Sequence, residues 1–177
     1  MKVPEQIETE RLLLRRPRME DAPAIFDGWA QDREVTRHLA WRPHQSIQET
    51  QTFIQRCLAA WESRARFPYV ISLRESGEVI GMIDPRIEVP KVEIGYGARR
   101  SHWGKGYVTE AVGAIIEWAF QQPSIHRVYA TTDVDNAASQ RVLEKAGMQC
   151  EGILRKYILH PNISDVPRDS YIYAIIK

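Results

Sequence analysis

Residues 91–121 read KVEIGYGARRSHWGKGYVTEAVGAIIEWAFQ, and this stretch decides the fold because it predicts a strand, a turn and a helix in succession. The turn, residues 101–107, is positively charged and contains Gly104 and Gly106. Glycines directly before a helix expose its first, unpaired N–H groups, which favour an anion such as a phosphate or diphosphate. The helix itself is predicted by apolar residues three and four positions apart: Val108, Ala111, Val112, Ile115, Ile116 and Ala119.

The strand before the turn has one apolar face and one nearly bare face. Alternation places Glu93, Gly95 and Gly97 on the bare face, opposite Val92, Ile94, Tyr96 and Ala98. An extended ligand that contains amides can hydrogen-bond along such a strand as an added strand. The pantetheine arm of coenzyme A is such a chain, and its diphosphate would then reach the turn. A bulge in this strand would change which side chains face the ligand.

Two other phosphate-binding motifs do not fit the turn. A P-loop requires four residues between its glycines and a Ser or Thr after the lysine, but Gly104 and Gly106 are two apart and Tyr107 holds the later position. The dinucleotide fingerprint requires a third glycine, which is missing here.

The composition is that of an ordinary globular protein. The 177 residues, expected to form one domain over 1–177, are 44% hydrophobic and 27% charged, with a net charge of +1. This balance gives no general attraction to nucleic acid or membranes, and we expect neither as a partner. The first 30 residues lack a continuous apolar run, so we expect no signal peptide or membrane span and a cytoplasmic location. Cys57 and Cys150 are expected to be reduced thiols, and the histidines lack ligand spacing, so we predict no metal.

The rest of the chain predicts a mixed α/β, or α+β, domain around one sheet of about seven strands with about four helices. A loop is expected at 84–90, and the segment 31–45 is expected to be irregular. The predicted strands are 12–16, 67–74, 78–84, 92–98, 126–133, 148–159 and 170–176. The predicted helices are 19–30, one that begins at Ser46 with a capping box at Glu49, the one after the turn, and a short one capped by Asn136 and ended by Gly147.

Two motifs together resemble one known family. HWGKGYVTEA at 102–111 and DNAASQRVLEKAGM at 135–148 are similar to the GNAT superfamily of acyl-CoA-dependent N-acyltransferases. The opening ETERLLLRRPRMEDA and the closing RDSYIYAIIK resemble its Rim-type branch, which acetylates the N-termini of ribosomal proteins. The resemblance extends from about residue 9 to 177 and implies a mostly antiparallel, twisted central sheet and acetyl-CoA as the acyl donor.

The resemblance also implies roles for particular residues. Glu93 is the candidate base, acting directly or through a water, although an exposed carboxylate or structural ion pair is the alternative. The family's usual tyrosine on the second motif helix is Leu143 here, so we assign Ser139, otherwise a packing residue, to stabilise the thiolate. Backbone N–H groups around Ile94 to Gly97 would meet the oxyanion. The expected coenzyme A contacts are Ile94, Gly95, Tyr96, Ser101, His102, Trp103, Gly104, Lys105, Gly106, Tyr107 and Asn136.

The acceptor side is less defined, although loops on a rigid scaffold commonly set specificity. We expect the loops 31–45 and 160–169 to wall the acceptor site, and Asp169 either to contact an amine or to orient Arg168. The expected function is acetyl transfer to a primary amine, such as a protein N-terminus. The alternatives are a small amine (a polyamine, amino acid or aminoglycoside) and a non-catalytic acyl-CoA-binding module. Monomer and homodimer both remain open.

Overall fold

The computed structural model describes residues 1–177 and contains one eight-stranded sheet in the order β1-β2-β3-β4-β5-β6-β8-β7. All neighbouring pairs are antiparallel except β5 and β6, so the prediction of a mostly antiparallel sheet is confirmed. The strands are β1 Gln6–Glu8, β2 Leu12–Arg15, β3 Tyr69–Leu73, β4 Val79–Glu88, β5 Lys91–Ala98, β6 Arg127–Asp133, β7 Gln149–Ile158 and β8 Arg168–Ile176.

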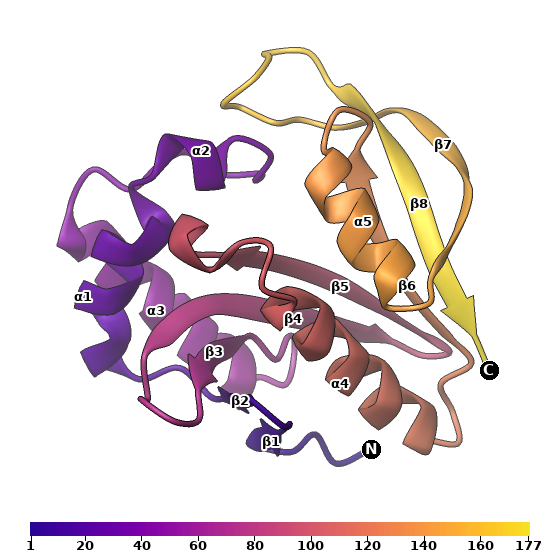
Figure 1. Cartoon of the computed structure of the whole chain (residues 1–177), viewed down its shortest axis with the longest axis horizontal. Helices are drawn as coiled ribbons and strands as arrows, with labels where there is room; N and C mark the ends of the chain where they lie inside the picture. Colours follow the sequence, from indigo (N-terminus) through magenta and orange to yellow (C-terminus); the bar gives the residue numbers. More distant parts are fainter.

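Helices cover both faces of this sheet (Figure 1). They are α1 Ala22–Ile25, α2 Arg33–Thr36, α3 Ile47–Glu62, α4 Tyr107–Gln121 and α5 Ala137–Lys145. The predicted helix at 19–30 is present, but its pitch changes along its length, because α1 lies between a 3-10 turn at Met19–Asp21 and a π-helical turn at Phe26–Ala30. None of the helices combines the length and apolarity that crossing a membrane requires.

Two apolar cores hold the layers together. The larger core joins the sheet to α4 and α5, with Ile94, Ile115 and Leu143 almost fully buried. The smaller core joins α1 and α3 to the other face through Ile25, Ile54 and similar residues. Because burying one such side chain contributes about 1.5–3 kcal/mol, these contacts fix the position of α4 beside β5.

Three segments differ from the sequence predictions. The expected loop at 84–90 is mostly strand, because β4 continues to Glu88. Pro85 is tolerated there because its position requires no backbone N–H. On one side it pairs with Ile94 at a position of the β5 ladder that does not use this N–H. On the other side β3 pairs with β4 only as far as Tyr69 and Ile83, so Pro85 has no partner there. β1 was not predicted, because its three residues are largely polar, and the short α2 lies in the segment expected to be irregular.

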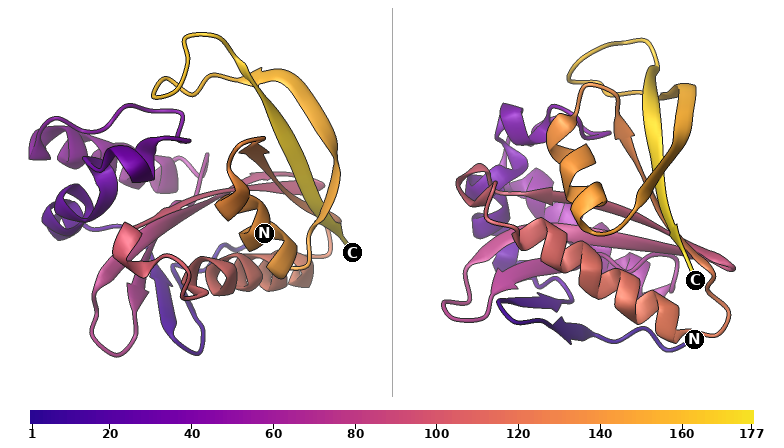
Figure 2. Two further views of the ribbon diagram at one scale, coloured as in Figure 1. Left: turned by 45° about the horizontal axis from the view of Figure 1, so that its top comes forward. Right: turned by 45° about the vertical axis from the view of Figure 1, so that its right-hand side comes forward.

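The sheet opens between β5 and β6. β5 pairs with β4 in continuous register from Lys91 to Ala98, so no bulge disturbs the predicted alternation. With β6, in contrast, β5 forms only three parallel pairs, and the last joins Glu93 to Tyr129. The strands diverge beyond that point, and Figure 2 shows α5 and β6 on one side of the opening and β5 on the other.

Candidate active site

The glycine turn has the geometry of an anion site. Gly104 and Gly106 have φ angles of +74° and +81°, a region that glycine adopts without strain. Gly106 is the residue before α4, and no side chain caps the first N–H groups of this 15-residue helix. These donors and the positive end of the helix therefore suit the diphosphate of an acyl-CoA.

Contacts from both sides hold this turn in place. The Trp103 ring nitrogen Nε1 donates to the Ala98 carbonyl at 2.8 Å, which fixes the turn to the end of β5, while the residue as a whole is 46% exposed. Arg11 donates to the Lys105 carbonyl at 3.0 Å, and its guanidinium lies 4.6 Å from the Tyr107 ring centroid. The aromatic side chains thus shape the turn.

A network that sequence reasoning missed braces the first turn of α4. Glu110 accepts hydrogen bonds from the Thr9 hydroxyl at 2.6 Å, the Arg11 N–H at 2.9 Å and Arg11 Nε at 2.6 Å. Burial alone would raise the pKa of Glu110, but these hydrogen bonds lower it. The partners are about a hundred residues apart in the chain, so no local pattern reveals them.

The remaining side chains of the turn are polar and accessible. Ser101 is exposed, and its Oγ lies 3.1 Å from His102 Nδ1. Burial lowers the pKa of His102, and its Nε2 lies 3.7 Å from a Glu78 carboxylate oxygen. Lys105 is exposed, and its ammonium takes part in none of the ion pairs of the structure. Lys105 therefore remains available to an incoming phosphate.

The open edge of β5 presents the backbone of Tyr96. The Arg99 N–H donates to the Ile80 carbonyl, so by alternation the backbone groups of Gly97 and Gly95 face β4. Those of Tyr96 face the other way, where β6 has already diverged. The backbone N–H and C=O of Tyr96 are therefore free to bind an extended ligand. Gly95 offers no free backbone group, only a surface without a side chain.

Tyr96 also connects β5 to α5 through its side chain. Its hydroxyl oxygen lies 2.8 Å from Ser139 Oγ, and burial raises its pKa while the hydrogen bond to Ser139 lowers it by less. Asn136 caps α5 by accepting the Ser139 N–H at 3.2 Å, which leaves its own amide N–H groups available. Leu143 is fully buried in the larger core, so it offers nothing to a ligand.

Glu93 lies on the opposite face of β5, where it ends a chain of charged side chains. Its Oε2 is 3.3 Å from Arg86 Nη1, and Arg86 Nε is 3.2 Å from Asp84 Oδ2. Arg66 binds the same oxygen, and the other Asp84 oxygen is buried without a hydrogen-bond partner. The structure is compatible with Glu93 as a base and with Glu93 in a structural ion pair. Its side chain is ion-paired with Arg86, yet it is 24% exposed beside the bare surface of Gly95.

The two loops expected to wall the acceptor site do contact each other. The Asn162 side-chain amide, in the connection between β7 and β8, donates to the Thr36 carbonyl at 2.7 Å and the Trp41 carbonyl at 2.8 Å. Figure 2 shows this connection arching toward α2. Asp169 does not orient Arg168, because its Oδ1 accepts the Lys156 backbone N–H at 2.8 Å, the amide of a residue with φ of +50°. A contact of Asp169 with an acceptor amine stays a prediction.

Behind these loops, Asp133 is buried at the end of β6 in a charged cluster. Burial alone would raise its pKa, but hydrogen bonds from Arg168, at 2.6 and 3.0 Å, and from the Asp135 N–H lower it. His38 and His160 lie 3.9 and 3.7 Å from its oxygens. Arg168 is thus oriented by Asp133, not by Asp169. No group of three or more His, Cys, Asp or Glu residues is placed to hold a metal ion.

The chain is similar to known proteins along most of its length. Residues 11–149 match a family model described as acetyltransferase (GNAT) domain. The uncharacterized N-acetyltransferase YoaA of Bacillus subtilis (strain 168) is 33% identical over 97% of this chain and 96% of its own. The [ribosomal protein uS5]-alanine N-acetyltransferase of Escherichia coli (strain K12) is 24% identical over 87% and 83%.

A solved structure has the same fold. The microcin C7 self-immunity acetyltransferase MccE, in complex with acetyl-CoA and AMP, superposes with a TM-score of 0.88 at 22% identity, covering 99% of this chain and 98% of its own. Together with the glycine turn, the open edge of β5 and the family match, these similarities show that the chain belongs to the GNAT acetyltransferase family and is an acetyl-CoA-dependent N-acetyltransferase.

Proposed function

We propose that this enzyme acetylates a protein N-terminus of the ribosomal type, with Glu93 as the base and Ser139 at the leaving sulfur. The observation that carries the proposal is the position of Glu93 beside the bare surface of Gly95, at the point where β5 and β6 separate. The similarity to the uS5-alanine N-acetyltransferase, over 87% of this chain, supports an N-terminal amine.

Acetyl-CoA supplies an activated acetyl group as a thioester. The acceptor nitrogen forms a bond to the carbonyl carbon while the carbon–sulfur bond breaks, so one proton must leave the nitrogen and one must reach the sulfur. Glu93 takes the first proton, directly or through a water. The Tyr96 N–H at the open edge can donate to the carbonyl oxygen.

The hydroxyl groups of Ser139 and Tyr96 serve the departing sulfur. Because burial raises the pKa of Tyr96, the phenol keeps its proton at neutral pH. Its contact with Ser139 Oγ allows the serine to donate to the thiolate while the phenol donates to the serine. Leu143 cannot protonate the thiolate and is buried in the larger core, so Ser139 and Tyr96 fill that role.

The direct test is acetyl transfer to peptides. The enzyme is incubated with acetyl-CoA and a panel of N-terminal peptides, including ribosomal-protein sequences, and the products are read by mass spectrometry. We expect a single added acetyl group on the α-amine. Absence of transfer to every peptide would count against a protein acceptor.

A small amine is the second candidate acceptor, and a pocket beside α3 favours it. This pocket, described in the next subsection, has a volume of about 520 Å³ and suits a compact group better than a whole protein surface. Comparing kcat/KM for polyamines, amino acids and aminoglycosides with that for peptides separates the two acceptors. The single domain over 1–177, the absence of a nucleic-acid or membrane partner, and the cytoplasmic location stay predictions.

A further inference from the structure

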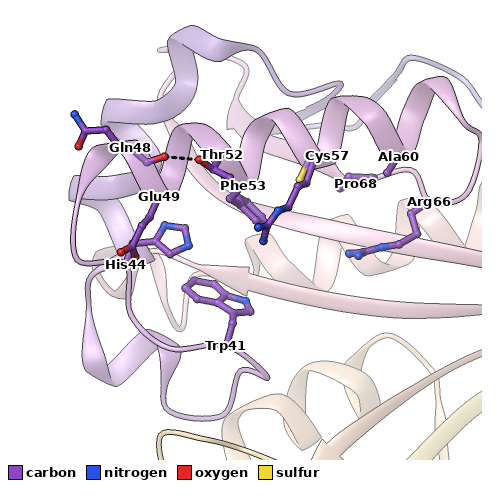
Figure 3. Close-up of a pocket in the computed structure, with 11 residues that line it drawn as sticks. Trp41, His44, Gln48, Glu49, Thr52, Phe53, Cys57, Ala60, Arg66 and Pro68 are labelled. Carbon is purple, nitrogen blue, oxygen red and sulfur yellow. Dashed lines mark hydrogen bonds between the residues drawn. The ribbon is translucent and has the colours of Figure 1, made fainter.

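A hollow lies between α3 and the loop that precedes it (Figure 3). Its walls come from that loop, from α3 and from the link to β3. Three of the lining side chains are aromatic rings, those of Trp41, His44 and Phe53, and two are guanidinium groups, those of Arg56 and Arg66. None of these five residues has a role in the donor site.

The aromatic rings form a fixed, uncharged wall. The Trp41 and Phe53 centroids are 6.2 Å apart with their planes tilted by 32°, and His44 lies 4.9 Å from Trp41. His44 is held by the Thr50 hydroxyl at 2.8 Å, and burial lowers its pKa. The wall therefore offers π faces to a planar ring, an interaction that favours aromatic over aliphatic groups.

The charged side chains of the pocket leave positive charge unused. Arg56 makes no hydrogen bond or ion pair, and Arg66 uses Nε and Nη2 on Asp84 but leaves Nη1 free. The only carboxylate in the lining, Glu49, keeps its negative charge, but it lies in the first turn of α3, about two turns before Arg56, and its Oε2 is directed to the Gln45 backbone N–H at 2.9 Å. Figure 3 shows the Arg66 side chain directed toward the aromatic residues. Such free guanidinium N–H groups suit a carboxylate or phosphate.

A chain of ion pairs connects the pocket wall to the proposed base, Glu93. Arg66 in its wall binds Asp84, and Asp84 lies on β4 directly opposite Gly95, while Arg86 lies opposite Glu93. Asp84 and Glu93 are thus diagonal neighbours on one face, a separation of roughly 7–8 Å. A ligand in the pocket can place an amine near Glu93 by extending over two residues of the sheet.

We propose that this pocket binds the acceptor through a planar aromatic ring and an adjacent anionic group, a carboxylate or a phosphate. This inference rests on the proposed amine acetylation and names the chemistry that selects its substrate. The ring stacks on Trp41 and Phe53, and the anion pairs with Arg56 and Arg66. The same chemistry occurs in a small amine and in a peptide with an aromatic and an acidic residue after its N-terminus.

The kinetic test compares matched acceptors. The peptide arm uses Ala-Phe-Glu, Ala-Leu-Glu, Ala-Phe-Gln and Ala-Leu-Gln with amidated C-termini, and the small-molecule arm uses phenylalanine, leucine and phenethylamine. In at least one arm we expect the acceptor with both groups to exceed each partner lacking one by about tenfold in kcat/KM. The arm that shows the preference identifies the source of the acceptor. Equal rates within both arms would overturn the proposal.

Variants then locate the effect in the pocket. Trp41→Leu and Arg56→Gln are expected to raise KM for the preferred acceptor about tenfold with kcat unchanged, and Arg56→Lys to restore part of the loss. The matched control is Arg155→Gln, because Arg155 on β7 is also exposed and unpaired. Unchanged KM in both pocket variants, with acetyl-CoA affinity and circular dichroism like those of the wild type, would refute the assignment.

A binding measurement separates failure of the pocket from failure of the proposed function. N-acetylphenylalanine, which carries the ring and carboxylate but no amine, is titrated by calorimetry against the wild type, Arg56→Gln and Arg155→Gln. N-acetylphenylalanine amide and N-acetylleucine are the controls. Selective binding that Arg56→Gln removes, with no acetyl transfer to any acceptor, supports the pocket and rejects the function. Acetyl transfer without selective binding or preference supports the function and rejects the pocket.

Discussion

The hydroxyl oxygen of Tyr96 lies 2.8 Å from Ser139 Oγ and so joins the middle of β5 to the first turn of α5. This pair crosses the opening between β5 and β6, the same opening that exposes the Tyr96 backbone. One residue therefore contributes backbone groups along the donor path and a protonated phenol at the proposed sulfur position.

If the pair supplies the proton to the leaving sulfur, Ser139→Ala and Tyr96→Phe should each lower kcat by about 10²-fold or more. Acetyl-CoA affinity should change little, because neither hydroxyl is needed by the diphosphate site. The double variant should be little slower than either single one, since the two groups act as a unit. Additive losses would mean that they act separately.

The pH dependence of Tyr96→Phe follows from the direction of the pKa change. Burial raises the pKa of the phenol above its ordinary value near 10, and the acid form exists below the pKa. The ratio of wild-type to Tyr96→Phe kcat should therefore stay constant between about pH 7 and 9. A ratio that falls within this range would show that the phenol loses its proton there.

Replacing the proposed base tests the opposite face of β5. Glu93→Gln should lower kcat/KM by about 10²-fold at neutral pH, because the amide cannot accept the proton. Glu88→Gln is the matched control, since Glu88 is an exposed strand carboxylate paired only with Lys91 at 3.4 Å. If Glu93→Gln is as active as Glu88→Gln, the Arg86–Glu93 contact is structural alone.

The glycine turn can be tested with two equivalent substitutions. Gly104 and Gly77 have φ angles of +74° and +71°, and an added Cβ would meet nothing within 4 Å at either position. Alanine should therefore cost a similar 1–2 kcal/mol or so of stability in both. Only Gly104→Ala should weaken acetyl-CoA binding, measured by calorimetry. Equal affinity in the two variants would remove Gly104 from the diphosphate site.

The Glu110 network should make stability depend on pH. The pKa of Glu110 is lowered in the folded protein, so its stabilisation is present above the ordinary value of 4.5 and is lost as the pH falls through the lowered pKa. Glu110→Gln should lower the free energy of unfolding by about 1–3 kcal/mol at pH 7, and the difference should shrink toward pH 3. Glu117→Gln, an exposed position on the same helix, is the control for thermal unfolding at each pH.

Local patterns predicted the strand and the two helices of the proposed donor side well. The sequence correctly predicted three elements: the strand at 92–98, the helix after the turn and the short helix capped by Asn136. It could do so because periodicity and capping are properties of neighbouring residues. The extension of β4 to Glu88 could not be predicted, because a proline such as Pro85 normally ends a strand. It is accommodated here only because its position in the pairing with β5 needs no N–H.

The contacts that brace the glycine turn, and those that join the two loops of the proposed acceptor side, were less predictable because distant segments form them. The contact of Glu110 with Arg11 spans 99 positions, and that of Asn162 with Thr36 spans 126. Asp169 was singled out, yet the neighbouring Arg168 holds the buried Asp133. Such pairings depend on the tertiary structure, so the local sequence around each residue does not predict them.

The separation of β5 from β6 has a consequence for the protein without its substrate. Unpaired strand edges invite pairing with other chains, and aggregation-resistant proteins usually keep them at the periphery, short or covered. Here such an edge lies in the middle of the sheet, recessed beside α5 and β6, where a slender ligand can reach it but a second sheet cannot. Because a ligand that binds only the folded chain stabilises it, we expect bound acyl-CoA to raise the free energy of unfolding, so the enzyme should resist unfolding best when its donor is abundant.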